Sequence, residues 1–244
     1  MKNSIRVVSF CLYGTNEYYR VGALRNVDLC KQVYPGWEVW IYVSPTIPKE
    51  LLKQLKDKGA TILVVSDQDN AYFMNYRFFP PADERVEYAI FRDTDSRVDE
   101  REAAAVNEWI QQGTGLHIMR DHPWHTPSPT HHMMLGGMWG VKGDKLRDVQ
   151  DILLSYKTLA NHGYDQWVIT RAIYPRFEND KTVHDEFYEK TKWPLPRTKM
   201  YVNGYKKEMY KFTGCQYGVD DQPIHPDHVG LLETALIENN LLPR

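Results

Sequence analysis

Hydrophobic residues in the first part of the chain gather in short runs that alternate with longer stretches of helical spacing. Four runs are bounded by turn residues and rich in β-branched and aromatic side chains. They predict buried strands over 7–12, 37–43, 61–65 and 86–91. One helix is predicted between the turn at 13–16 and the Tyr34-Pro35-Gly36 stop, and a second between Pro48 and Gly59.

The alternation continues toward the C-terminus with less regularity. A helix over 72–79 precedes a Pro-Pro pair, and Asp99 with Glu102 forms a capping-box signature for the next helix. Further strands are predicted over 116–119 and 138–141, and further helices over 149–159 and 165–174. From about Thr182 the pattern weakens. We therefore expect 182–244 to be a C-terminal wrapping segment of a single domain that covers 1–244.

Strands that alternate with helices predict an α/β fold with a mostly parallel central sheet, flanked by helices on both faces. Ligands in such sheets bind beyond the carboxyl ends of the strands. The turn that begins at Tyr13 and the acidic pair Asp93 and Asp95 both follow predicted strands. We expect these two segments to face the same crevice.

The Asp-x-Asp sequence at 93–95 is the main candidate for chemistry. Two carboxylates at a strand end can converge on one hard cation, and oxygen ligands with open positions suit Mg²⁺ or Mn²⁺. Arg92 and Arg97 flank the pair, and guanidinium groups match phosphate oxygens. The alternative interpretation is a surface turn capped by aspartate. Because strand side chains alternate, Arg92 could also point away from the site.

Composition and charge exclude several classes of protein. The formal net charge of −2 gives no bulk electrostatic case for nucleic-acid binding. No run of about 18 apolar residues occurs, so no transmembrane segment is predicted. The chain has three cysteines, which are widely spaced. This number and spacing favour a reducing compartment and argue against a disulfide framework or a zinc cluster. The first predicted strand lies close to the N-terminus, which argues against a signal peptide. We expect a cytoplasmic enzyme.

Four segments together resemble the small glycosyltransferases of the GT-A fold. They are Val8–Gly14, Arg92–Arg97, Leu135–Val141 and Tyr164–Gln166. The layout is similar to the retaining galactosyltransferase-like enzymes and to small virus-encoded glycosyltransferases, and the resemblance covers most of the chain. It implies the nucleotide-diphospho-sugar transferase fold.

The resemblance also implies roles for individual residues. The end of the first strand, with Ser9, Cys11 and Tyr13, would hold the nucleoside. Asp93, Thr94 and Asp95 would bind the metal and the diphosphate. Residues implied to contact the donor or its sugar are Arg77, Arg92, Arg97, Gly136, Gly137 and Trp139. The alternatives are a surface salt bridge for Arg77 and a tightly packed core strand for the glycine and tryptophan stretch.

Three carboxyl or amide groups are candidates for catalysis. Asp165 and Gln166 match an Asp-Gln pair that lines the sugar and acceptor side in the resembled enzymes, although Asp165 could instead be a helix N-cap. Asp121 follows a predicted strand end and could deprotonate an acceptor hydroxyl. The resemblance implies that a C-terminal histidine completes the metal shell, and His228 or His225 could supply it.

The predicted function is metal-dependent transfer of a hexose from a nucleotide sugar, most simply a UDP-sugar, to a glycan, lipid-linked or protein-linked acceptor. The predicted cofactor is Mn²⁺ or Mg²⁺, acting as Lewis acid and template. The sequence leaves inversion and retention open. Two other classes remain: a metal-dependent phosphohydrolase or nucleotidyltransferase that uses the same acidic pair, and a non-catalytic carbohydrate-binding module.

Overall fold

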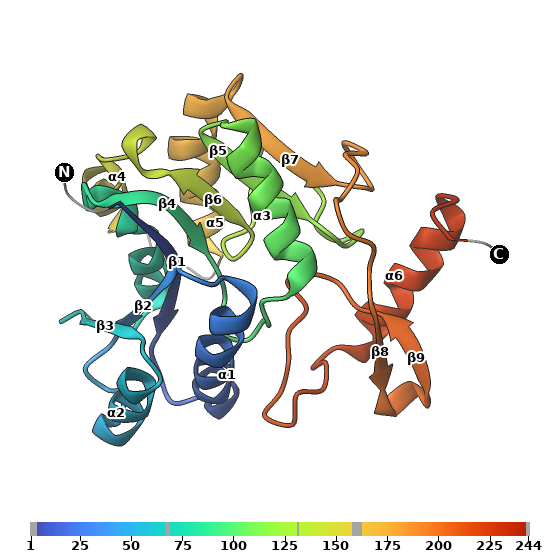
Figure 1. The fold of residues 1–244 in the computed structure, drawn as a ribbon, viewed down its shortest axis with the longest axis horizontal. Coiled ribbons are helices and arrows are strands. Elements are labelled where there is room, and N and C mark those ends of the chain that lie inside the picture. Colours follow the sequence, from blue (N-terminus) through green and yellow to red (C-terminus); the bar gives the residue numbers. More distant parts are fainter. Residues whose placement is uncertain (1–3, 67–68, 131, 158–162, 243–244) are drawn as a thin grey trace.

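A computed structural model describes residues 4–66, 69–130, 132–157 and 163–242 (Figure 1). Its centre is a seven-stranded sheet of order β3-β2-β1-β4-β6-β5-β7. Strand β6 runs antiparallel to its two neighbours, and the other paired strands are parallel. This confirms the predicted mostly parallel α/β sheet. The strands are β1 Ile5–Leu12, β2 Glu38–Val43, β3 Thr61–Val64, β4 Val86–Phe91, β5 Leu116–Arg120, β6 Trp139–Lys142 and β7 Lys181–Asp185.

Helices cover both faces of the sheet, as the alternation predicted. One face packs against α1, α2 and α3 through one buried apolar cluster, and the other packs against α4, α5 and short helices through a second. The helices are α1 Glu17–Val33, α2 Lys49–Asp57, α3 Glu100–Gln112, α4 Val149–Ser155, α5 Tyr164–Val168 and α6 Pro226–Glu238.

Some helix predictions needed adjustment. The segment predicted over 72–79 is a 3₁₀ helix, Ala71–Phe78. The helix predicted over 149–159 is shorter, because α4 ends at Ser155, and 158–162 lie outside the described residues. The helix predicted over 165–174 begins one residue earlier as α5 and continues as a π-helix over Ile169–Ile173.

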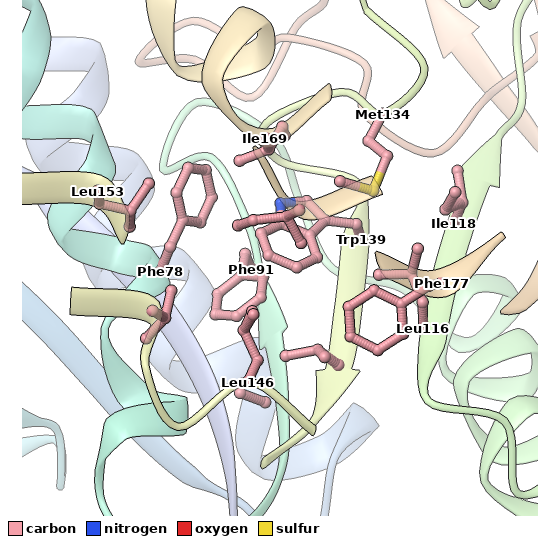
Figure 2. Close-up of a cluster of buried hydrophobic side chains, with 14 of the residues drawn as sticks. Phe78, Phe91, Leu116, Ile118, Met134, Trp139, Leu146, Leu153, Ile169 and Phe177 are labelled. Carbon is pink, nitrogen blue, oxygen red and sulfur yellow. The ribbon is translucent and has the colours of Figure 1, made fainter. Parts of the chain in front are cut away.

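Trp139 lies in the larger apolar core, and this corrects its predicted role at the sugar site. The side chain is fully buried in β6 and its ring centroid lies 4.2 Å from that of Phe91 and 5.2 Å from that of Phe78. Figure 2 shows the indole among aromatic and aliphatic side chains from several elements. The alternative interpretation, a packed core strand, therefore holds for this residue.

The C-terminal segment contains more regular structure than its sequence pattern predicted. Strand β7 joins the edge of the central sheet, and β8 Lys199–Val202 pairs with β9 Lys207–Tyr210 as a separate two-stranded sheet. The hairpin and α6 share their own hydrophobic cluster, and Figure 1 shows them together at the end of the molecule away from β3. Within the described residues, every helix is too short or too polar to cross a membrane.

Candidate functional site

A cavity of about 380 Å³ opens where β1 and β4 end, at the carboxyl edge of the sheet. Both segments that were predicted to face one crevice contribute to it, which confirms that expectation. Its lining includes Tyr13 and Asp93 from these two strand ends, and Gln166 from α5. The lining residues are Cys11, Leu12, Tyr13, Gly14, Thr15, Asn16, Tyr19, Met74, Arg77, Asp93, Thr94, Asp95, Gly163, Asp165, Gln166 and Gln216.

Helix α1 fixes the loop that carries the acidic pair. The buried Asn26 side chain donates to the backbone carbonyls of Thr94 at 3.3 Å and Ser96 at 2.8 Å. Gly22, one turn earlier, leaves room for the Thr94 carbonyl, which a Cβ at this position would overlap. The acidic pair thus sits on backbone that is tied to a long helix, which is the rigid support a binding site needs.

Arg77 is the hub of the polar network in the cavity. Its guanidinium is 3% exposed and forms ion pairs with Asp93 and, at 2.6 Å, with Asp165. It also lies 4.0 Å from the sulfur of Cys11. The alternative prediction of a surface salt bridge is wrong for this residue, because the ion pairs are internal and line the cavity.

Asp165 lies inside this network and does not cap a helix. Helix α5 begins at Tyr164 after Gly163, and no side chain caps it. The Asp165 side chain is 3% exposed. Burial raises the pKa of this carboxyl, and the Arg77 guanidinium opposes that shift. The N-cap interpretation is therefore wrong, and Asp165 presents a paired carboxylate to the cavity beside Gln166.

Gly136 and Gly137 contribute space to the same network. A Cβ at Gly136 would overlap Arg77 and Asp165, and one at Gly137 would overlap the Asp93 carboxylate. Neither glycine is among the lining residues of the cavity. The sequence predicted that these two glycines let the backbone come close to a bound donor. The structure shows instead that they admit the charged side chains that line the cavity.

Asp95 is the most perturbed acid in the cavity. It is 3% exposed, and burial, followed by repulsion from Asp93, raises its pKa to about 7. The Gln216 amide donates to its carboxylate at 2.8 Å, and the Tyr217 N–H donates to its backbone carbonyl at 2.8 Å. Sequence reasoning missed Gln216, because it lies in a C-terminal stretch that matches no motif.

The charges in the cavity are unbalanced. Among the described lining residues, Asp93, Asp95 and Asp165 are acids and Arg77 is the one base, so full ionisation leaves two negative charges uncompensated. A bound divalent cation would neutralise that excess, and carboxylate oxygens are the donors that Mg²⁺ and Mn²⁺ prefer. The Asp93 side chain is 43% exposed, so it remains accessible from the cavity. The donor set therefore fits a hard divalent cation.

The first-strand residues occupy different positions relative to the cavity. Cys11 and Tyr13 line it, and burial raises the pKa of each to about 12, so both are neutral at physiological pH. Ser9 is fully buried within β1 and does not line the cavity. This placement does not fit the predicted contact between Ser9 and the nucleoside.

The two arginines that flank the acidic pair do not line the cavity, which corrects their predicted roles. Arg92 is 1% exposed, and its Nε lies 3.0 Å from a carboxylate oxygen of Glu102 in α3. Glu102 therefore does not complete a capping box, although Asp99 does cap α3. Arg97 pairs with Asp221 at 2.9 Å and donates to backbone carbonyls of its own loop. Strand alternation explains the orientation of Arg92.

Asp121 belongs to a second, closed network, and this corrects its candidacy as a general base. Its side chain is fully buried and pairs with Arg101 at 3.1 Å and Arg197 at 2.6 Å. It also accepts the Thr213 N–H at 2.8 Å. It does not line the cavity. Both oxygens of this carboxylate already accept hydrogen bonds within the fold, and the cavity does not reach it, so it is not placed to meet an acceptor hydroxyl.

The candidate histidines lie at the start of α6 and not among the lining residues. The donor atoms of His225, Asp227 and His228 lie within 4.8 Å of one another. The structure therefore groups the two histidines with Asp227. The position beside Asp95 that the resemblance assigned to a histidine is taken by Gln216.

Comparison with known proteins gives a result at the level of the fold. No family model matches the chain, and no curated protein matches its sequence. Among solved structures, TarS 1–349 of S. aureus is similar with a TM-score of 0.50 and 12% identity, over 74% of this chain and 57% of that one.

Two further solved structures are similar. The glycosyltransferase GlyE of Streptococcus pneumoniae TIGR4 has a TM-score of 0.49 and 15% identity, over 77% of this chain and 46% of that one. The galactosyltransferase LgtC, solved with donor and acceptor sugar analogues, has a TM-score of 0.49 and 10% identity, over 75% of this chain and 74% of that one. The chain spans about half the length of the GlyE and TarS structures. At these identities the likeness is one of fold, and the chain has the GT-A fold.

Proposed function

We propose that the protein is a metal-dependent glycosyltransferase that uses a nucleotide sugar. The observation that carries this proposal is a single cavity at the carboxyl edge of a GT-A sheet, where the Asp93–Asp95 pair faces Arg77, Asp165 and Gln166. A donor of this class has a diphosphate that needs a cation and a sugar that needs polar groups. The cavity offers both kinds of group side by side.

The nucleoside end of the donor is assigned to the end of β1. Tyr13 lines the cavity there, its ring centroid 5.1 Å from that of Phe73, and the following turn carries backbone N–H and C=O groups. An aromatic face and backbone polar groups suit a base and a ribose. We propose uridine as the base because of the resemblance to galactosyltransferase-like enzymes.

The diphosphate is assigned to the acidic pair. Asp93 and Asp95 would hold Mn²⁺ or Mg²⁺, with the Asp95 carboxylate oriented by the Gln216 amide. The bound cation would neutralise charge that develops on the departing diphosphate. Without a cation the excess negative charge of the cavity would repel that diphosphate, which is the physical reason to expect metal dependence.

The sugar is assigned to the side of the cavity formed by α5. Asp165 is held in place by Arg77, and Gln166 lies next to it with a neutral amide. Carboxylate and amide oxygens can accept hydrogen bonds from sugar hydroxyls and stabilise positive charge on the ring as the glycosidic bond breaks. Proposed acceptors are hydroxyl groups of a glycan, a lipid-linked saccharide or a protein. Hexose transfer is part of the proposal.

Incubation of the purified chain with a panel of nucleotide sugars and Mn²⁺ tests this function, with free nucleotide and sugar-modified acceptor measured in parallel. Transfer that requires Mn²⁺ and increases with acceptor is the expected result. Asp165→Asn should abolish transfer, and Asp221→Asn, a carboxylate outside the cavity, should not. Nucleotide-sugar cleavage that is insensitive to every acceptor would instead favour the metal-dependent phosphohydrolase.

A further inference from the structure

Three metal-ligating side chains meet at the first turn of α6. The donor atoms of His225, Asp227 and His228 lie within 4.8 Å of one another, and the two imidazole rings are stacked with centroids 4.7 Å apart. The exposed His225 stands at the N-cap position without capping the helix. Within the described part of the chain, none of the three side chains forms a hydrogen bond or ion pair. Their donor atoms are therefore not used by the fold.

The surroundings of His228 restrict where its ring can lie. Trp124 packs against it with ring centroids 4.2 Å apart, and His122 lies on another side at 5.9 Å. The His122 Nε2 also donates to the His228 backbone carbonyl at 2.8 Å. One ligand is thus held by neighbouring rings and by its backbone, while the exposed His225 can adjust toward a bound ion.

The ligand set differs in kind from that of the cavity. Two imidazole nitrogens and one carboxylate suit Zn²⁺ and related transition metals, whereas carboxylates without imidazole suit Mg²⁺ and Mn²⁺. The positive end of the α6 dipole opposes a cation at this position, but Asp227 in the first turn offsets it with a negative charge. An open coordination position would be filled by water.

None of the three residues lines the cavity at the carboxyl edge of the sheet, so the cluster is separate from the Asp93–Asp95 pair. The cluster comes directly after the loop that carries Gln216. The N–H of Ile224, the residue before His225, donates to the Gln216 carbonyl at 2.9 Å, so this loop ends where the cluster begins. We propose that His225, Asp227 and His228 form a transition-metal site of the Zn²⁺ class that fixes the junction between this loop and α6.

Isothermal titration of the metal-free full chain with Zn²⁺, without nucleotide, tests the proposal. The expected result is saturable binding of about one Zn²⁺ at this site. His225→Gln and His228→Gln should each weaken that binding by about tenfold or more, since each removes a ligand. His225 is exposed, so its variant keeps the fold even if the His228 variant does not.

Matched controls separate this site from the cavity and from the proposed function. Asp220→Asn, an exposed acid in the preceding loop, and Asp93→Asn, in the cavity, should retain Zn²⁺ affinity. Zn²⁺ binding that is absent, or that His225→Gln and His228→Gln leave unchanged, would overturn the proposal. Because no donor sugar is present, the result stands independently of glycosyl transfer.

Discussion

Two buried ion networks in this protein contain carboxylates that the sequence marked as candidates for catalysis, Asp165 in one and Asp121 in the other. In the first, Arg77 pairs with Asp93 and Asp165, and the cavity that they line also contains Asp95, so three acids face one base. The network around Asp121 has two acids, Asp121 and Glu186, for two bases, Arg101 and Arg197, and lies outside that cavity. The first network has fewer bases than acids, and in the second the numbers of acids and bases are equal.

The difference teaches how to separate ligand-binding acids from structural ones. In the closed network Asp121 accepts from two arginines and a backbone N–H, and Arg101 also donates to the Leu195 carbonyl. It thereby ties β5 and α3 to the C-terminal segment. In the network that lines the cavity, the missing positive charge must come from a bound ligand such as a cation. Charge balance and access, more than residue type, distinguish the two.

The largest expected effect is on transfer activity in Asp95→Asn. The variant keeps the shape of the side chain but removes the charge that would bind the cation. Metal-assisted stabilisation is worth several kcal/mol, so activity should fall by about a thousandfold, or about 4 kcal/mol. The fold should persist, since a buried carboxylate with a raised pKa is replaced by a neutral amide. Steady-state kinetics with a melting curve checks both, and unchanged transfer would remove the basis of the proposed function.

The next effect is on stability, in Asp121→Asn. Loss of this charge leaves the buried Arg101 and Arg197 with Glu186 alone, which should cost about 3 kcal/mol of unfolding free energy. Turnover per folded molecule should stay near wild type. Urea unfolding gives the first quantity and kinetics the second. Asp221→Asn is the matched control: its side chain is 42% exposed in its pairs with Arg97 and Arg25, so the change should cost less than about 1 kcal/mol. A stable but inactive Asp121 variant would show that Asp121 acts in catalysis and would contradict its assignment to a structural network.

A smaller effect is expected on turnover in Gln166→Ala. If the amide acts only as the glycosidic bond breaks, kcat should fall by about tenfold or more, equivalent to about 1.4 kcal/mol, with nucleotide affinity nearly unchanged. The reason is that the base and the diphosphate are assigned to other parts of the cavity. Activity within about twofold of wild type would move the sugar-side role to Asp165 alone.

A buried pair of histidines, outside both networks, is expected to make stability depend on pH. His117 and His184 are fully buried, with Nε2 of the first 2.9 Å from Nδ1 of the second. Burial holds the pKa of His117 well below its usual 6.5. The unfolded chain therefore binds a proton that the folded chain does not. The contribution of His117 to stability should be constant above about pH 6.5 and fall below it, by about 1.4 kcal/mol per pH unit.

Denaturant unfolding at several pH values between neutral and mildly acidic conditions measures this loss. His117→Gln should make the acid limb shallower, because glutamine binds no proton in either state. An equally steep acid limb in the variant would assign the loss of stability to other groups.

Hydrophobic patterning predicted the sheet, its flanking helices and the edge at which the cavity lies. The strand ends at Tyr13 and Asp93 could be located because apolar runs stop abruptly there. Arg92 and Asp121 were misassigned for a common reason. Sequence shows that a charge follows a strand, but it does not show whether a partner such as Glu102 or Arg197 closes over it.

The C-terminal contributions were the hardest to predict. Gln216 reaches Asp95 across 121 residues of chain, and no local spacing signals such a contact. The β8–β9 hairpin and α6 were missed because their short amphipathic stretches pack against one another, so no single stretch has a strong period. Long-range contacts of this kind depend on the completed fold.

The central claim is that the cavity binds a nucleotide sugar with the help of a divalent cation held by Asp93 and Asp95. Thermal unfolding of wild type and Asp95→Asn, with a panel of nucleotide sugars in the presence and absence of Mn²⁺, tests it most directly. A cognate donor at about a hundred times its dissociation constant should stabilise wild type by about 2.7 kcal/mol with Mn²⁺, and much less without it. Asp95→Asn should lose the Mn²⁺-dependent part. Stabilisation that is equal with and without Mn²⁺, or equal in the two proteins, would contradict the claim.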